Sequence, residues 1–175
     1  MSVIMLRSWL LAGLMAVTGL VSSAVSTSAQ ALEAVTGDPV LTVSGSIAKT
    51  NVGDSAVFDN ALLDALPQYT ITTTTPWYEG EKTFEGPLIK DVLAAVQASG
   101  KTLTFTALND YESTLPVSDL AKYNVILARK IDGKMLSVRD KGPLFVIYPF
   151  DANPELKTKS YYSRCAWQVT SMKVE

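Results

Sequence analysis

The chain has 175 residues, of which 47% are hydrophobic and 18% charged, and its formal net charge is −2. This composition indicates one ordinary globular domain whose core needs no metal or disulfide support, and the absence of a run of Lys and Arg argues against nucleic acid as a partner. The sequence has no histidine, which removes the commonest general base and most zinc sites, together with Ser-His and Cys-His nucleophiles.

Residues 1–31 have the features of a cleaved signal peptide. Arg7 precedes an apolar run from roughly Trp9 to Val21, and Ala29-Gln30-Ala31 fits a signal-peptidase site. The alternative, an uncleaved anchor, is weaker because the run is shorter than the ~20 residues that span a bilayer. We therefore expect an exported mature chain that begins near Leu32, is not inserted in the membrane, and is periplasmic in a bacterium with two membranes.

The first part of the mature chain predicts a strand and a helix. Val40–Ser46 alternates between apolar and polar residues, which is typical of a strand. Ala56–Leu66 carries its large apolar residues at helical spacing, with Asp54 or Ser55 as its cap and Pro67 after its end.

Tyr69–Leu93 is the stretch around which we expect the functional site. Its first seven residues form a β-branched run of period two, which predicts a strand that ends at Pro76. Trp77 and Tyr78 follow in a predicted loop closed by Glu79-Gly80, with Glu79, Glu81 and Lys82 expected in a solvated turn. Gly86-Pro87 then opens a predicted helix that ends at Ser99-Gly100. A strand end, an aromatic loop and a helix start at one place favour a ligand site.

The remainder predicts short strands with one further helix, and therefore an α+β domain with a mixed sheet and short flanking helices. The lone Cys165 lies in an apolar strand-like segment, so we expect a buried structural thiol. The predicted elements are strand Leu103–Ala107, turn Asn109–Tyr111, helix 117–123, apolar run Val125–Ala128, hairpin turn Asp132-Gly133, strand Leu144–Tyr148 and strand Ala166–Val174.

Several motifs in this order resemble the molybdopterin-binding oxidoreductase domain of the sulfite oxidase family. They are ALPQYTITTTTPW, FEGPLIKDVL, NDYESTLPVSDL, the DGK hairpin, GPLFVIYP and SRCAWQV. The resemblance covers residues 39–175 as one domain, preceded by a short segment at 32–38, and it implies the sulfite oxidase-type mixed-sheet fold.

Two departures from the family pattern bear on function. Its catalytic members bind molybdenum through a cysteine thiolate near the end of the strand before the tryptophan loop, where this sequence has Thr72–Thr75. A threonine hydroxyl is a hard, scarcely ionised ligand and cannot replace a soft thiolate. Ala166 stands where cofactor-binding members carry a lysine. We therefore expect no catalytic residue, no catalytic cofactor and no bound molybdenum.

The resemblance further implies a non-enzymatic, periplasmic pterin-binding protein. Small proteins of this pattern are similar to a group that senses exported pterins, in the tetrahydro form or another, and reports to the periplasmic domain of an inner-membrane enzyme that controls cyclic-di-GMP and biofilm formation. Aromatic residues would stack on the ring, Asp110 or Asp151 would pair with its edge, and Arg164 would hold the carbonyl or the tail. The candidate ligand-binding residues are Thr75, Trp77, Tyr78, Asp110, Tyr111, Tyr148, Tyr162, Ser163 and Arg164.

Each candidate has a structural alternative. For Tyr148 and Trp167 we favour packing, because each lies in an apolar strand, whereas Trp77 lies in a polar loop and favours binding. Asp110 could make an Asx turn, and Arg164 could form a surface salt bridge. Two other functions also stay open, an atypical molybdenum-cofactor oxidoreductase and a ligand-free interaction module of the cell envelope.

Overall fold

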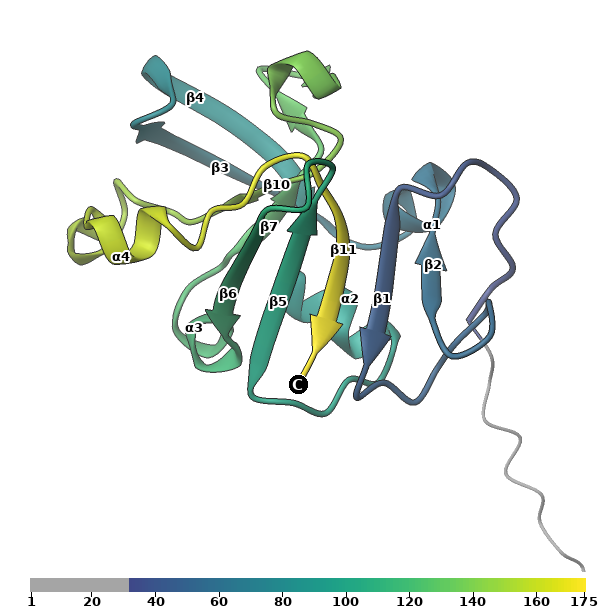
Figure 1. Ribbon diagram of the computed structural model, residues 1–175. Coiled ribbons are helices and arrows are strands. Elements are labelled where there is room, and N and C mark those ends of the chain that lie inside the picture. The colour runs from purple at the N-terminus through teal and green to yellow at the C-terminus, as the bar shows by residue number, and fades with distance from the viewer. Residues whose placement is uncertain (1–31) are drawn as a thin grey trace, which may run out of the picture.

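A computed structural model describes residues 32–175 (Figure 1), so the predicted signal peptide lies outside the described residues. The largest sheet has five strands in the order β2-β1-β11-β5-β6. β1 pairs with β11 in parallel and the other neighbours are antiparallel, which makes the sheet mixed. Its strands are β1 (Leu41–Gly45), β2 (Ala56–Phe58), β5 (Thr102–Ala107), β6 (Glu112–Pro116) and β11 (Val169–Val174).

A second sheet is built on one long hairpin. β3 (Gln68–Thr75) and β4 (Tyr78–Pro87) pair along their length, and the short hairpin of β8 (Lys130–Ile131) and β9 (Lys134–Met135) extends the sheet beyond β4. A third, two-stranded sheet pairs β7 (Ile126–Ala128) with β10 (Phe145–Ile147).

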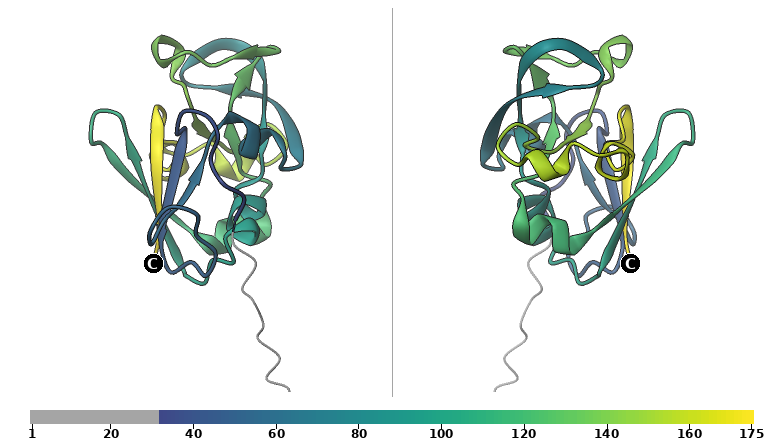
Figure 2. Two further views of the ribbon diagram at one scale, coloured as in Figure 1. Left: turned by 90° about the vertical axis from the view of Figure 1, so that its right-hand side faces the viewer. Right: turned by 90° about the vertical axis from the view of Figure 1, so that its left-hand side faces the viewer.

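The helices are short, and the longest, α2, has seven residues. Figure 2 shows α2 and the four-stranded sheet on the same face of the five-stranded sheet. Within residues 32–175, no helix is both long enough and apolar enough to cross a membrane. The helices are α1 (Asn60–Asp64), α2 (Ile89–Ala95), α3 (Val117–Lys122) and α4 (Lys159–Tyr162), with 3-10 turns at η1 (Val138–Asp140) and η2 (Pro154–Leu156).

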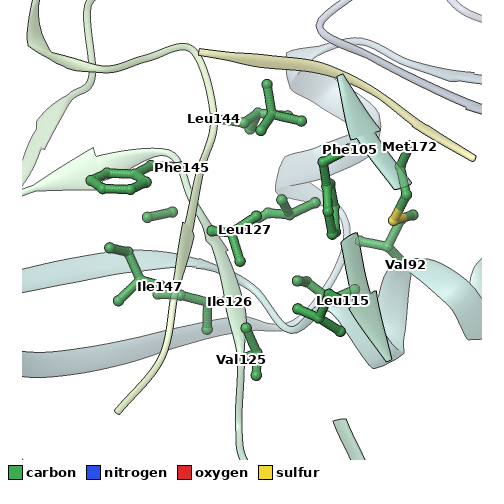
Figure 3. Close-up of a cluster of buried hydrophobic side chains, with 14 of the residues drawn as sticks. Val92, Phe105, Leu115, Val125, Ile126, Leu127, Leu144, Phe145, Ile147 and Met172 are labelled. Carbon is green, nitrogen blue, oxygen red and sulfur yellow. The ribbon is translucent and has the colours of Figure 1, made fainter. Parts of the chain in front are cut away.

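One hydrophobic core joins the three sheets. Phe105 and Met172 come from the five-stranded sheet, Leu127 and Phe145 from the two-stranded sheet, and Val92 from α2 (Figure 3), and all five are fully buried. The strands β7 and β10 are buried along their whole length, as expected for continuous apolar runs. These two strands are therefore the centre of the molecule.

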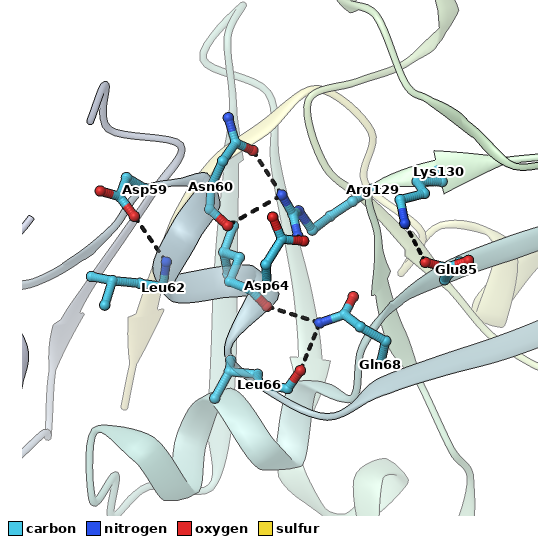
Figure 4. Close-up of polar contacts among 10 residues, drawn as sticks. Asp59, Asn60, Leu62, Asp64, Leu66, Gln68, Glu85, Arg129 and Lys130 are labelled. Atoms are coloured by element: carbon cyan, nitrogen blue, oxygen red, sulfur yellow. Dashed lines mark hydrogen bonds and ion pairs between the residues drawn. The ribbon is translucent and has the colours of Figure 1, made fainter. Parts of the chain in front are cut away.

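A buried cation fastens α1 to the strands. The side chain of Arg129 is 2% exposed, and its guanidinium forms an ion pair with Asp64 and donates to Asn60 Oδ1 at 2.8 Å (Figure 4). The backbone N–H of Arg129 also donates to the carbonyl of Glu85 on β4 at 2.8 Å. Arg129 thus links the helix to β4.

The α+β class and most predicted strands are confirmed, but three element predictions were wrong. Gly86 and Pro87 are the last residues of β4 and do not open the helix, since α2 begins at Ile89. Ala56–Phe58 is strand β2 instead of the first helical turn, and Asp59, not Asp54 or Ser55, caps α1 by accepting the Leu62 N–H. The predicted solvated turn at residues 79–82 lies within β4, which runs to Pro87. Strand pairing with β3 outweighs the low strand propensity of Glu and Gly there.

Candidate functional site

Trp77 lies at the centre of an aromatic cluster. It sits in the short connection between β3 and β4, and its ring packs edge to face against Phe145 at 5.2 Å, Tyr162 at 5.9 Å and Trp167 at 6.1 Å between ring centroids. Phe150 is a further neighbour at 6.4 Å. Trp77 is partly buried, so much of its surface is used in packing.

A cavity opens beside this cluster. It has a volume of about 230 Å³ and is lined by Ala107, Asn109, Tyr111 and Trp167. The Trp167 side chain is 39% exposed and that of Tyr111 52% exposed, which is high for rings of this size. Two accessible aromatic rings at one small cavity form a surface on which a flat ligand can stack.

A cation borders the same surface. Lys141 Nζ lies 5.0 Å from the centroid of the Tyr78 ring and 6.0 Å from that of Trp167. The Tyr78 hydroxyl donates to the carbonyl of Asp140 at 3.0 Å, and burial, together with the Asp140 charge, raises the pKa of Tyr78. Tyr78 is therefore a neutral donor whose hydrogen bond fixes the backbone of the residue before Lys141.

Asp110 lies in the turn between β5 and β6, with a positive φ of 61°. Its neighbour Asn109 makes the local turn contact, accepting the Tyr111 N–H at 3.3 Å. The carboxylate of Asp110 is exposed and makes no hydrogen bond or ion pair within residues 32–175. It is thus free to pair with a ligand at the edge of the cavity.

Tyr148 and Arg164 are engaged in a buried network. Tyr148 is fully buried, and its hydroxyl donates to Asp119 Oδ2 at 2.7 Å. The same carboxylate oxygen also accepts a hydrogen bond from Arg164 Nη1 at 2.5 Å. The guanidinium of Arg164 stacks on Tyr161 at 4.6 Å, and burial, reinforced by the bond to Asp119, raises the pKa of Tyr148. The Tyr148 ring offers no face to a ligand, and Arg164 is held by Asp119.

Asp151, beside the end of β3, and Ser163, after α4, are engaged among the described residues, whereas the Thr75 hydroxyl is not. Asp151 accepts a hydrogen bond from the backbone N–H of Thr74 at 2.5 Å and forms an ion pair with Lys157. These contacts, that with Lys157 first, hold the pKa of the Asp151 carboxyl well below its usual range. The Thr75 hydroxyl is buried without a partner in the described part of the chain. Ser163 Oγ donates to the Ser160 carbonyl at 2.9 Å.

The structure therefore brings together part of the predicted site. Trp77 contacts both Trp167 and Tyr162, and Tyr78 shares the neighbour Lys141 with Trp167. Tyr111 lines the cavity together with Trp167, and Asp110 lies in the turn beside it. Tyr148, Ser163 and Arg164 make contacts within the protein instead.

A sequence model of the family described as oxidoreductase molybdopterin binding domain matches residues 14–151. The chain belongs to this family. The crystal structure of the sulfane dehydrogenase SoxCD from Paracoccus pantotrophus has a similar fold, with a TM-score of 0.61 and 17% sequence identity, over 78% of this chain and 38% of that chain. No curated protein matches the sequence.

Cys165 is the residue to consider as a ligand for molybdenum, because a protein thiolate would have to hold the metal. The one thiol, Cys165, is 2% exposed and lies 3.5 Å from the Tyr161 carbonyl. Burial is the main cause that raises its pKa, so the group remains a protonated thiol. The side chains described do not fit a molybdenum held by a protein thiolate, whereas the exposed aromatic surface suits a flat ring.

Trp167 and Lys141 belong to the aromatic surface beside the cavity, but the sequence did not predict them as ligand-binding residues. We favoured packing for Trp167, yet its ring lines the cavity because residues 166–168 precede β11 and the chain turns outward there, with Gln168 at a φ of 54°. Lys141 lies in the turn before Pro143, and no motif around it in the sequence indicates a binding residue. The positive φ of 73° at Lys141 is a backbone feature that composition does not disclose.

Proposed function

We propose that this molybdopterin-domain protein is a non-enzymatic pterin-binding protein. The observation that carries the proposal is the pair of exposed rings, Trp167 and Tyr111, at a cavity of about 230 Å³. The burial of the only thiol supports recognition of the ring without a metal.

The chemistry of the surface suits a pterin. A pterin is flat, so both faces can stack on aromatic rings, at about 1–3 kcal/mol for each ring by analogy with nucleobases. Its edge carries N–H groups that can donate two hydrogen bonds to one carboxylate. Asp110 supplies a free carboxylate in the turn beside the cavity. Lys141 lies over the Trp167 ring and can approach a carbonyl or a negatively charged tail of the ligand.

The proposal extends to a periplasmic signalling role. In it, the exported protein relays its ligand state to the periplasmic domain of an inner-membrane enzyme that controls cyclic-di-GMP. This part rests on the motif resemblance and the signal-peptide pattern of residues 1–31. Capture of that membrane enzyme by the tagged protein, with a yield that changes when pterin is added, is the measurement that checks it.

Pterin binding is tested by titrating the purified protein with a reduced pterin under anaerobic conditions and following tryptophan fluorescence. We expect saturable quenching, and an affinity roughly 5- to 150-fold weaker in Trp167→Ala, which corresponds to the loss of about 1–3 kcal/mol of stacking. Tyr69→Ala is the matched control, because Tyr69 is also 39% exposed but lies on β3, away from the cavity lining.

The same preparation separates the alternatives. Mass spectrometry of protein isolated from cells should find a pterin, and elemental analysis should find less than stoichiometric molybdenum. Stoichiometric molybdenum would establish the oxidoreductase alternative. If neither co-purifying pterin nor saturable binding is observed, the ligand-free interaction module becomes the better account.

A further inference from the structure

The four-stranded sheet has an open edge. β3 is the outer strand of the order β3-β4-β8-β9 and pairs only with β4 in the sheet, and the hairpin projects from the body of the molecule (Figure 1). Sheet edges present unpaired backbone groups and are normally protected by charged residues, by proline or by a covering segment. β3 is eight residues long, and its sequence QYTITTTT contains neither a charge nor a proline.

The outward-facing residues of β3 follow from its hydrogen bonds. Thr83 of β4 pairs with Thr72 in register, but the Thr83 carbonyl accepts the Asp132 N–H at 2.8 Å and the Thr83 N–H donates to Asp132 Oδ1 at 3.1 Å, both on the side away from β3. Thr72 therefore directs its own N–H and C=O away from β4. The close contact of 3.1 Å between the Thr72 and Thr83 hydroxyls is typical of such a pair.

Alternation along the strand extends this assignment. Gln68 and Thr70 share the parity of Thr72, and the partner of Gln68 is Pro87, which has no N–H to donate. Thr74 has the same parity, and its outward N–H is already occupied by Asp151. The open edge thus consists of Gln68, Thr70 and Thr72, all with exposed side chains.

We propose that this edge pairs with the same edge of a second copy of the chain, in an antiparallel arrangement centred on Thr70. Thr70 then faces Thr70 of the other copy and Gln68 faces Thr72, which gives three pairs with two backbone bonds each, roughly six hydrogen bonds. Asp151 ends the open edge at Thr74 and so limits the register.

The side chains favour this self-pairing. None of residues 68–75 is charged, so no like charges are brought together. Tyr69, which is 39% exposed, lies opposite Ile71 of the second copy, and the two residues gain an apolar contact on the core side of the joined sheet. The result is a continuous eight-stranded sheet across a two-fold axis. The interface does not involve the aromatic cavity, so it stands independently of pterin binding.

Sedimentation velocity of the full mature chain over a range of micromolar concentrations tests the proposal. We expect a reversible dimer, and at least tenfold weaker dimerisation in Thr70→Lys, because two introduced lysines meet at the two-fold axis. Thr114→Lys is the matched control: it places the same charge at an exposed position of β6, the edge strand of the other sheet, and should leave dimerisation unchanged.

A cross-link fixes the register. In the dimer of Thr70→Cys, the two introduced cysteines face each other in a hydrogen-bonded pair, with their Cα atoms about 5.5 Å apart, which is within the range of a disulfide. The native thiol of Cys165 is buried and does not compete. We expect a covalent dimer on mild oxidation, and none in Thr114→Cys. The proposal would be overturned by a wild-type chain that stays monomeric at every concentration. It would equally be overturned by a dimer that persists in Thr70→Lys while Thr70→Cys forms no cross-link.

Discussion

At the scale of single residues, Asp59 fixes the beginning of the described chain to α1. Its carboxylate accepts the N–H groups of Leu62 at 2.9 Å, Gly37 at 2.8 Å and Thr36 at 3.0 Å. These backbone bonds, that of Leu62 first, lower its pKa from 3.8 to about 2. A lowered carboxyl pKa contributes stability that is complete above pH 3.8 and is lost as the pH falls through about 2.

We therefore expect Asp59→Asn to lower Tm by several degrees at pH 7 and by less as the pH falls from 3.8 towards 2. Thermal unfolding followed by circular dichroism across this range measures the difference. Asp151, whose pKa is also lowered, titrates in both proteins and cancels in the comparison. A difference between variant and wild type that does not change with pH would contradict this account.

At the scale of elements, β4 depends on a close approach to β7. A Cβ atom at Gly86 would lie 1.9 Å from the Leu127 carbonyl oxygen, which belongs to the backbone and cannot move aside. Gly86 therefore allows the long hairpin to pack on the central strands. The FEGPL motif marks this contact, although its glycine suggested a helix start from sequence alone.

Gly86→Ala should accordingly lower the free energy of unfolding by about 3 kcal/mol or prevent folding. Gly80→Ala is the control for backbone strain alone, because Gly80 has a φ of 68° but open space around it. It should lower the free energy of unfolding by about 1–2 kcal/mol. Urea denaturation of both variants measures the two values. Equal losses would show that β4 does not need the close approach.

At the scale of the whole molecule, the three sheets share one core. Trp77 and Trp167 both contact Phe145 of β10, which lies in that core. We expect a single cooperative unfolding transition in urea, with coincident midpoints for tryptophan fluorescence and far-ultraviolet circular dichroism. Separate midpoints would show that the hairpin sheet unfolds on its own.

The sequence predicted the fold better than the site. Alternation and apolar runs located β1, β3, β5, β7 and β10, because one or both faces of each strand are buried. The site depends on contacts between segments distant in sequence, such as Trp77 with Trp167 and Tyr148 with Asp119. No local pattern reveals that Tyr148 turns inward while Trp167 turns outward, since both lie in apolar segments.

The position of β11 bears on the order in which the largest sheet can form. Residues 169–174 fill the space between β1 and β5, so the largest sheet stays in two parts until this segment is in place. Before that, β1 and β5 each have an unpaired edge that faces the place of β11, and such edges can pair with another chain. The insertion of β11 thus both completes the sheet and removes two edges that favour aggregation.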